Sequence, residues 1–202
     1  MKAWIFRCSP GVGAAIALLV AGSAHAARWT GAPSSASACA VPALTQPFLS
    51  FGDLGWYAIA PGESYDDLTG SGWTLAGGAR IATTKRYDGT TGDVLDLPHG
   101  ATATSPAMCV SSAYPTARTM VRDVSGSAGV SMSVAYVSST STASTSTSTI
   151  RGLHAAWSLS PVVNIKPSKV NGWLLARFTF VATGATGEDQ LYNFYVDPRM
   201  SS

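Results

Sequence analysis

The stretch Trp173-Leu-Leu-Ala-Arg-Phe-Thr-Phe-Val-Ala182 decides the fold class, because its apolar residues recur at every second position. The apolar side consists of the even-numbered residues Leu174, Ala176, Phe178 and Phe180. Successive side chains of a strand point to opposite faces, so a period of two predicts a strand with one buried face. Trp173, Arg177 and Thr179 would share the outward face.

A second strand is predicted at Leu191–Asp197, after the polar loop Thr183–Asp189. Tyr192, Phe194 and Val196 form its apolar side. The polar loop favours an antiparallel hairpin between the two strands, in a register that places Arg177 near Tyr195. One outward surface would then carry Trp173, Arg177, Asn193 and Tyr195.

Similar short runs, rich in β-branched and aromatic residues and separated by Gly, Pro, Ser and Thr, precede these strands. They are Trp56–Pro61, Gly72–Thr83, Val94–Pro98, Ala107–Ser111, Ser131–Val137 and Ala155–Ile165. No clear helical stripe follows residue 26. The sequence therefore predicts an all-β, two-sheet β-sandwich, with a jelly roll favoured over a barrel.

The N-terminus is typical of a secretory signal peptide, predicted to span residues 1–26. Lys2 and Arg7 precede the apolar run Gly11–Ala21, which leads to the cleavage motif Ala24-His-Ala26. The apolar run is about half of the ~20 residues that a membrane span needs. We therefore expect an exported protein, extracellular or periplasmic, without a membrane span after signal cleavage.

The remaining chain suits one domain. We expect a flexible segment at 27–38, a single β-sandwich at 39–198 and a tail at 199–202. Without Lys2 and Arg7, basic and acidic residues balance at 11 each. No basic stripe therefore supports binding to nucleic acid.

Cys39 and Cys109 are the cysteines that remain after signal cleavage. The oxidising environment of an exported protein favours a disulfide between them. Closing a loop of that length would stabilise the fold by roughly 4 kcal/mol on the chain-entropy model. The alternative, half of a metal site, is disfavoured because His99 and His154 have no ligand-like spacing to either cysteine.

The segment 138–149 contains only Ser and Thr apart from Ala143. Its threonines fall on even positions before Ala143 and on odd positions after it. Such a switch of parity predicts a polar hairpin that turns near Ala143–Ser144, with a loop as the alternative.

Catalytic motifs are not evident in the sequence. There is no G-x-S-x-G elbow, no H-E-x-x-H motif and no P-loop. The aspartates provide candidate carboxylates, but no spacing singles out the pair that a glycosidase needs. We therefore expect no enzyme and no catalytic residue, with a hydrolase as the alternative.

Several short motifs, in one order, resemble an uncharacterised family of secreted bacterial proteins that is common in actinobacteria. They are Leu44–Asp53, Trp56-Tyr57, Ala60–Asp66, Gly72–Ala79, Leu95–Gly100, Ser105–Val110, Pro115–Arg118 and Tyr195–Pro198. The resemblance covers most of residues 39–198. It implies a jelly roll similar to carbohydrate-binding modules and a bridge between the two matching cysteines, but no established activity.

The resemblance also implies a metal hypothesis. Carbohydrate-binding jelly rolls often hold a structural calcium ion with carboxylates from the first and last strands, and calcium takes 6 to 8 oxygen ligands. Tyr65-Asp66 matches the opening aromatic and acid, and Tyr192-Asn193 matches the closing pair. Asp66 and Asn193 are therefore the candidate calcium ligands. The rest of this segment is expected to be framework, with Trp73 packed in the sandwich.

An outward aromatic beside an arginine and an amide is typical of a sugar-binding surface, since sugar C–H groups pack on rings and planar polar groups reach hydroxyls. Trp173, Arg177, Asn193 and Tyr195 are therefore the candidate ligand-binding residues. The alternative is that Trp173 covers a sheet edge. The functional hypothesis is a non-catalytic module for glycan or cell-envelope polysaccharide, with a structural or adhesive surface protein as the alternative.

Overall fold

The computed structural model describes residues 33–40, 42–63, 69–111, 116–127, 129–137, 142–152, 155–165 and 173–197. The predicted signal peptide and the tail lie outside these ranges. The described chain has two 3-10 turns, η1 (Ala36–Ala38) and η2 (Leu49–Phe51). No helix in the described ranges is long and apolar enough to cross a membrane.

The strands are β1 (Ala58–Ile59), β2 (Thr74–Ala76), β3 (Arg80–Lys85), β4 (Thr91–Pro98), β5 (Thr102–Thr104), β6 (Met108–Val110), β7 (Thr116–Ser127), β8 (Val130–Val137), β9 (Thr142–Ile150), β10 (Ser158–Leu159), β11 (Val163–Asn164), β12 (Leu174–Ala182) and β13 (Thr186–Asp197).

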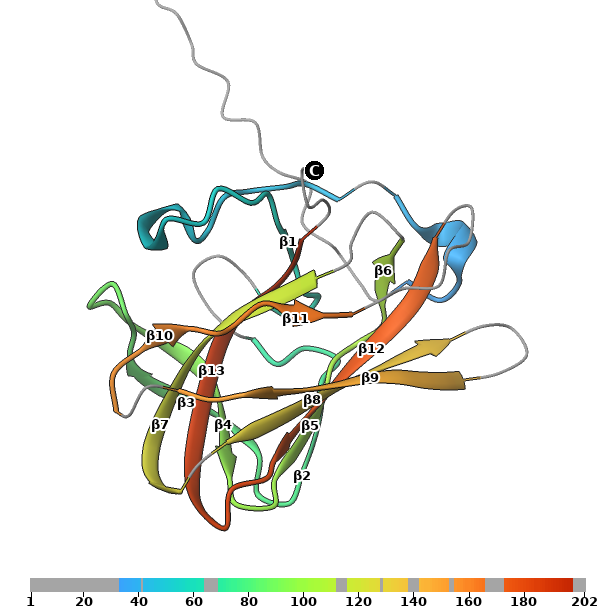
Figure 1. Ribbon diagram of the computed structural model, residues 1–202. Helices are drawn as coiled ribbons and strands as arrows, with labels where there is room; N and C mark the ends of the chain where they lie inside the picture. The colour runs from blue at the N-terminus through green and yellow to red at the C-terminus, as the bar shows by residue number, and fades with distance from the viewer. Residues whose placement is uncertain are drawn as a thin grey trace, which may run out of the picture.

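These strands form two sheets that pack face to face (Figure 1). The seven-stranded sheet has the order β10-β7-β13-β4-β3, with β1 paired to β13 and β11 paired to β7. The six-stranded sheet has the order β2-β5-β12-β8-β9, with β6 paired to β12. The chain passes from one sheet to the other several times, for example between β4 and β5, β7 and β8, and β12 and β13, as in a jelly roll. The predicted all-β, two-sheet jelly-roll sandwich is confirmed.

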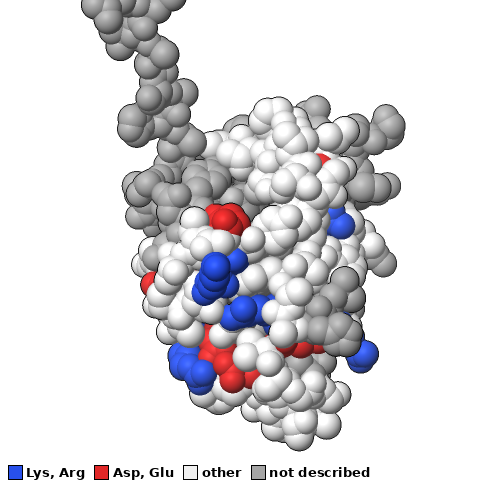
Figure 2. All heavy atoms as spheres, turned by 90° about the vertical axis from the view of Figure 1, so that its left-hand side faces the viewer, with Lys and Arg blue, Asp and Glu red and all other residues white. Residues whose placement is uncertain are grey.

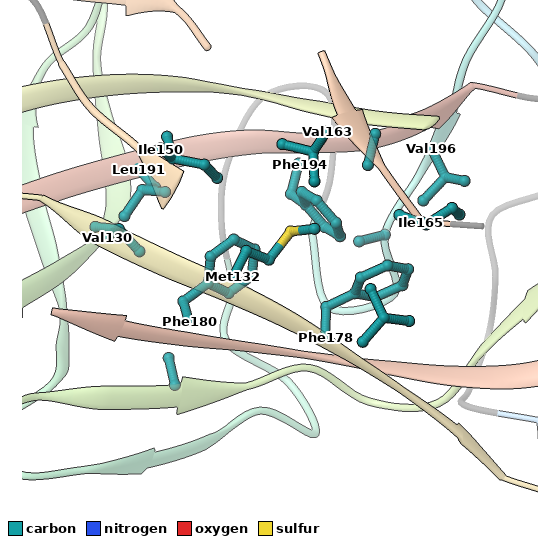
Figure 3. Packing of buried hydrophobic residues seen from close by; sticks show 14 of the residues in the cluster. Val130, Met132, Ile150, Val163, Ile165, Phe178, Phe180, Leu191, Phe194 and Val196 are labelled. Carbon is teal, nitrogen blue, oxygen red and sulfur yellow. The ribbon is translucent and has the colours of Figure 1, made fainter. Parts of the chain in front are cut away.

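The main core lies between the two sheets. Figure 3 shows Phe178 and Phe180 of the six-stranded sheet pointing toward Phe194 of the seven-stranded sheet. The ring centroid of Phe194 lies 4.9 Å from that of Phe178 and 5.1 Å from that of Phe180. The even-numbered side of β12 is therefore the core side, as the alternation of this strand predicts.

The predicted hairpin between β12 and β13 is wrong, because the two strands belong to different sheets. Arg177 stands opposite Ala135 of β8, whereas Tyr195 stands opposite Arg118 of β7. One side of β12 pairs with β8 and the other with β5 and β6. The apolar sides of β12 and β13 therefore meet across the core rather than side by side.

A bulge at Asn193 changes the sides of β13. Asn193 has a left-handed backbone with a φ of 56°, and the register with β7 shifts between Tyr192 and Tyr195. One extra residue moves every side chain beyond it to the other face. Phe194 and Val196 consequently reach the main core, but Tyr192 joins Tyr195 in a second cluster. The expected core position of Tyr192 is therefore wrong.

The Ser/Thr-rich segment does not turn at Ala143–Ser144, contrary to the prediction. From Thr142 to Ile150 it forms β9, a single strand paired with β8. Ser146 stands opposite Val134, but the next pair is Ser144 with Ala135, so Thr145 is the extra residue of a bulge. The bulge, and not a hairpin, explains the switch of parity. Residues 138–141 lie outside the described ranges.

The predicted disulfide is confirmed, and Trp73 packs in the sandwich as expected. Cys39 and Cys109 are bonded, with their Cα atoms 5.7 Å apart. A side chain at Gly77 would place its Cβ 2.8 Å from the carbonyl oxygen of Gly100, so the two backbone segments approach closely there. Trp73 packs beside Phe180, with ring centroids 6.0 Å apart, and its Nε1 donates to the carbonyl of Pro61 at 3.1 Å.

Candidate functional site: the outer face of the seven-stranded sheet

The structure does not bring the four predicted ligand-binding residues together. Trp173 is half-buried against the main core, and Arg177 is exposed on the outer face of the six-stranded sheet. Tyr195 is only 1% exposed and belongs to the second cluster on the other sheet. The four residues therefore share no surface, and a ligand-binding role for any of them stays a prediction.

The predicted calcium pair is also only partly visible, because Asp66 lies outside the described residues. Asn193 forms the bulge in β13, and here the backbone N–H groups of Asn193 and Phe194 donate to the carboxyl group of Glu63. Burial of that carboxyl group raises the pKa of Glu63 to about 8, although these N–H groups and Arg86 favour the charged form. Asp66 and Asn193 stay an untested hypothesis.

We call the outer face of the seven-stranded sheet the aromatic face. A second hydrophobic cluster covers part of it. Its buried members are Phe48, Tyr57, Val94, Met120, Tyr192 and Tyr195. The Phe48 ring meets Tyr57 and Tyr195 edge to face, with centroid distances of 5.1 and 5.4 Å. The segment before β1 therefore acts as a cover for this sheet.

An ion pair holds this cover on the sheet. Asp53 pairs with Arg118 of β7 and accepts hydrogen bonds from the Tyr57 hydroxyl at 2.6 Å and the Gly55 N–H at 2.8 Å. Burial opposes the charged form of Asp53, but these hydrogen bonds and the Arg118 charge prevail and lower its pKa. The carboxylate is therefore ionised and engaged at neutral pH.

Four side chains form a line across the rest of this face, which we call the polar row. In register order they are Arg80 of β3, Asp96 of β4, Gln190 of β13 and Arg122 of β7. Arg80 forms an ion pair with the fully buried Asp96, whose Oδ1 accepts a hydrogen bond from Gln190 Nε2 at 3.0 Å. Gln190 Oε1 accepts from Arg122 Nε at 2.9 Å and Nη2 at 2.6 Å. Each group therefore fixes the orientation of the next.

Aromatic rings adjoin the polar row. The Arg122 guanidinium lies 4.7 Å from the centre of the Trp157 ring, and Trp157 meets Tyr192 edge to face at 4.7 Å. Tyr87 is 51% exposed and packs on Phe51, with ring centroids 4.5 Å apart. The rings and the polar row therefore lie on the same face.

Charged groups gather on this side of the molecule. Figure 2 shows Lys, Arg, Asp and Glu side chains in a band across it. A hydrogen bond with Asp96, burial and the Asp96 charge together raise the pKa of Glu188. Desolvation lowers the pKa of Arg122. Groups of both charges therefore lie side by side on this face.

Sequence reasoning missed Arg122, Trp157 and Tyr87. Arg122 belongs to β7, which was not among the predicted strands. The alternation of Arg118, Met120 and Arg122 with Ala117, Thr119 and Val121 in Thr116–Ser127 was the available signal. Trp157 lies 35 positions further along the chain, and only the pairing of β10 with β7 brings it to Arg122.

Comparisons with known proteins give weak structural likeness only. No protein-family model matches the chain, and no curated protein matches it. Among solved structures, a xylan-binding domain from CBM 22 has a TM-score of 0.42 and 15% identity, over 74% of this chain and 98% of that chain. The family 11 carbohydrate-binding module from Clostridium thermocellum, in complex with a mixed-linked tetrasaccharide, has a TM-score of 0.40 and 12% identity, over 65% and 91%.

Larger proteins also contain similar regions. The enzymatically active domain of bacteriophage CBA120 tailspike protein 4 has a TM-score of 0.44 and 15% identity, over 63% of this chain. The match spans only 19% of the tailspike chain. None of these likenesses assigns the chain to a family.

Proposed function

We propose that the protein is an exported, non-catalytic module that binds a glycan, such as a cell-envelope polysaccharide, on the aromatic face. The observation that carries the proposal is the polar row beside Trp157 and the exposed ring of Tyr87. Sugar rings present C–H groups to aromatic planes and hydroxyls to planar polar groups. Both kinds of partner are present on this face.

The fixed geometry of the polar row supports binding. Arg122 is held by Gln190 and by the Thr84 hydroxyl, which accepts from its Nη2 at 2.7 Å. A side chain that is already ordered loses little entropy when a ligand arrives. Arg122, which is partly exposed and held in place by the buried Gln190, would therefore donate to sugar hydroxyls without rearranging.

The same geometry argues against a catalytic role for Asp96. A general acid or nucleophile has to reach the substrate. Asp96 is 0% exposed and is engaged by Arg80 and Gln190. The carboxylate at the centre of the polar row is thus a positioning group, and the proposal is a binding module.

The disulfide supports the export part of the proposal. Disulfides persist in oxidising compartments outside the cytosol, and the bond between Cys39 and Cys109 agrees with the predicted signal peptide. This supports the proposal that the mature protein is extracellular or periplasmic.

Retention of the mature protein on insoluble polysaccharides and on a glycan array tests the proposal. Tyr87→Ala removes a half-exposed ring and is expected to weaken retention about fivefold, since an aromatic contact contributes ~1 kcal/mol. Arg177→Ala is the matched control, because Arg177 is exposed on the opposite sheet.

The outcomes separate the two candidate surfaces. Loss of retention in Arg177→Ala with normal retention in Tyr87→Ala would move the site to the sequence-predicted residues on β12. An absence of retention on every glycan would favour the structural or adhesive alternative.

A further inference from the structure

Two acidic residues meet at the end of the main core. Asp123 of β7 stands directly opposite Asp189 of β13 in the seven-stranded sheet. Asp189 is 1% exposed, whereas Asp123 is partly exposed at the rim. This pair lies outside the polar row and takes no part in the proposed glycan site.

The opposite sheet fixes both carboxylates. Asp189 Oδ2 accepts a hydrogen bond from the N–H of Gly129, just before β8, at 2.9 Å. Asp123 Oδ1 accepts one from the N–H of Gly152, just after β9, at 3.0 Å. A Cβ at Gly152 would lie only 2.5 Å from Asp123 Oδ1, so this approach requires glycine. The two carboxylates therefore cannot easily turn away from each other.

The remaining oxygen of Asp189 has no donor. Its Oδ1 is buried without a hydrogen-bond partner. No ion pair between described residues involves Asp123 or Asp189. Two facing carboxylates cannot both carry a charge in such a place unless a positive charge or a proton lies between them.

We propose that Asp123 and Asp189 bind a divalent cation, calcium in the first place, at the end of the sandwich. A charge of 2+ neutralises both carboxylates. Oxygen-only donors select calcium or magnesium over softer metals. Two side chains supply fewer ligands than calcium takes, and water entering at the exposed side of Asp123 completes the shell.

The cation would act as a clamp between the sheets. The carboxylates come from β7 and β13, and the N–H groups that orient them flank β8 and β9 of the other sheet. This site differs from the hypothesis on Asp66 and Asn193 and does not depend on glycan binding.

Calorimetric titration of the chelator-treated mature protein with CaCl2 and with MgCl2 at pH 8 tests the site. We expect a single binding event and a melting temperature that rises with calcium concentration, because the cation binds only the folded state. Asp189→Asn and Asp123→Asn should abolish both signals. Asp88→Asn is the control, since Asp88 lies in an exposed turn where it accepts from Thr90 at 2.9 and 2.7 Å.

The contrary results are also defined. Neither heat nor a melting shift with millimolar calcium or magnesium would show that the pair holds only a proton, and would overturn the proposal. A shift that persists in both variants but disappears in Asp66→Asn would also overturn it, in favour of the other calcium hypothesis. If Asp123→Asn or Asp189→Asn fails to fold, the wild type and Asp66→Asn still test the site: no heat in the wild type, or loss of the heat in Asp66→Asn, overturns the proposal.

Discussion

The outer faces of the two sheets carry different kinds of side chain. The aromatic face carries rings and charges, with Phe48 and Tyr57 of the covering segment packed on Tyr195 of β13. The outer face of the six-stranded sheet, which we call the hydroxyl face, carries short hydroxyl side chains. Thr74, Thr104, Thr179 and Ser133 stand in one row across it. Arg177 is the only charged residue within the described strands of that face.

The difference shows what each face requires. Large exposed rings on a sheet are unfavourable in water. On the aromatic face, the segment before β1 covers them, and the ion pair between Asp53 and Arg118 holds this segment on the sheet. Threonine and serine can remain in water, and the hydroxyls of Thr104 and Thr179 hydrogen-bond at 3.1 Å. The aromatic face should therefore respond strongly to mutation and pH, and the hydroxyl face weakly.

The largest effect is expected from Phe48→Ala. Removing a ring that is 1% exposed leaves a cavity under the cover and should cost about 3–5 kcal/mol of unfolding free energy. Leu49→Ala is the matched control, because Leu49 is 52% exposed and should change stability by less than about 0.5 kcal/mol. Urea unfolding measures both. Equal losses would show that the cover does not pack as described.

Glu63 gives the seven-stranded sheet a pH dependence. Its folded-state pKa of about 8 lies above the ordinary value of 4.5, so its carboxyl group holds a proton in the folded state that the unfolded chain releases. This contribution is complete below pH 4.5, falls as the pH rises and levels off above 8. The decline between pH 5 and 7 should be about 2 kcal/mol, because one pKa unit is worth about 1.4 kcal/mol.

Glu63→Gln isolates that contribution. The amide cannot ionise, and its oxygen can still accept the N–H of Phe194, which donates to Glu63 Oε2 at 3.0 Å in the wild type. The difference in unfolding free energy between variant and wild type should therefore grow in favour of the variant from pH 5 to 7. A difference that stays constant with pH would contradict the buried, protonated carboxyl group.

Asp53→Asn should cost about 1.5 kcal/mol at pH 7, because hydrogen bonds to a charged group contribute ~1.5–3 kcal/mol and the pair with Arg118 is partly exposed. The lowered pKa of Asp53 means that its contribution is present above the unfolded-state pKa and is lost as the pH falls through the folded-state value. Wild type and variant should therefore converge in acid. Hydrogen exchange should show faster opening of the cover in the variant at pH 7, and an unchanged exchange rate would refute its role as the fastener.

How far the sequence predicts the molecule depends on the range of the signal. Alternation within β12 identifies its core side, since the period of two is a local property. The bulges at Asn193 and Thr145 each insert a single residue, and nothing near them in the sequence distinguishes a bulge from a turn or an unbroken strand. After Ala182 the chain passes to the other sheet because other strands already flank β12. The three loop residues Thr183–Ala185 do not show whether the next strand will pair with β12 or join the other sheet.

The site was harder to predict than the fold for the same reason. Trp173 and Arg177 attract attention because they interrupt an apolar strand, yet one is half-buried and the other lies alone on the hydroxyl face. The polar row takes one residue from each of β3, β4, β13 and β7. Only the strand order brings these residues into line, and the sequence does not specify that order.

Thr179→Val should have the smallest effect, within about 0.5 kcal/mol of the wild type. The substitution removes the hydroxyl partner of Thr104, but Thr104 is only half-buried, so water replaces the lost bond. Valine keeps the β-branched shape that suits a strand. Urea unfolding of the Thr179→Val and Gln190→Leu variants compares the two faces directly. Gln190→Leu removes the side chain that hydrogen-bonds with both Asp96 and Arg122. A loss in Thr179→Val as large as that in Gln190→Leu would mean that the hydroxyl face is structurally as demanding as the polar row, and the contrast between the two faces would fail.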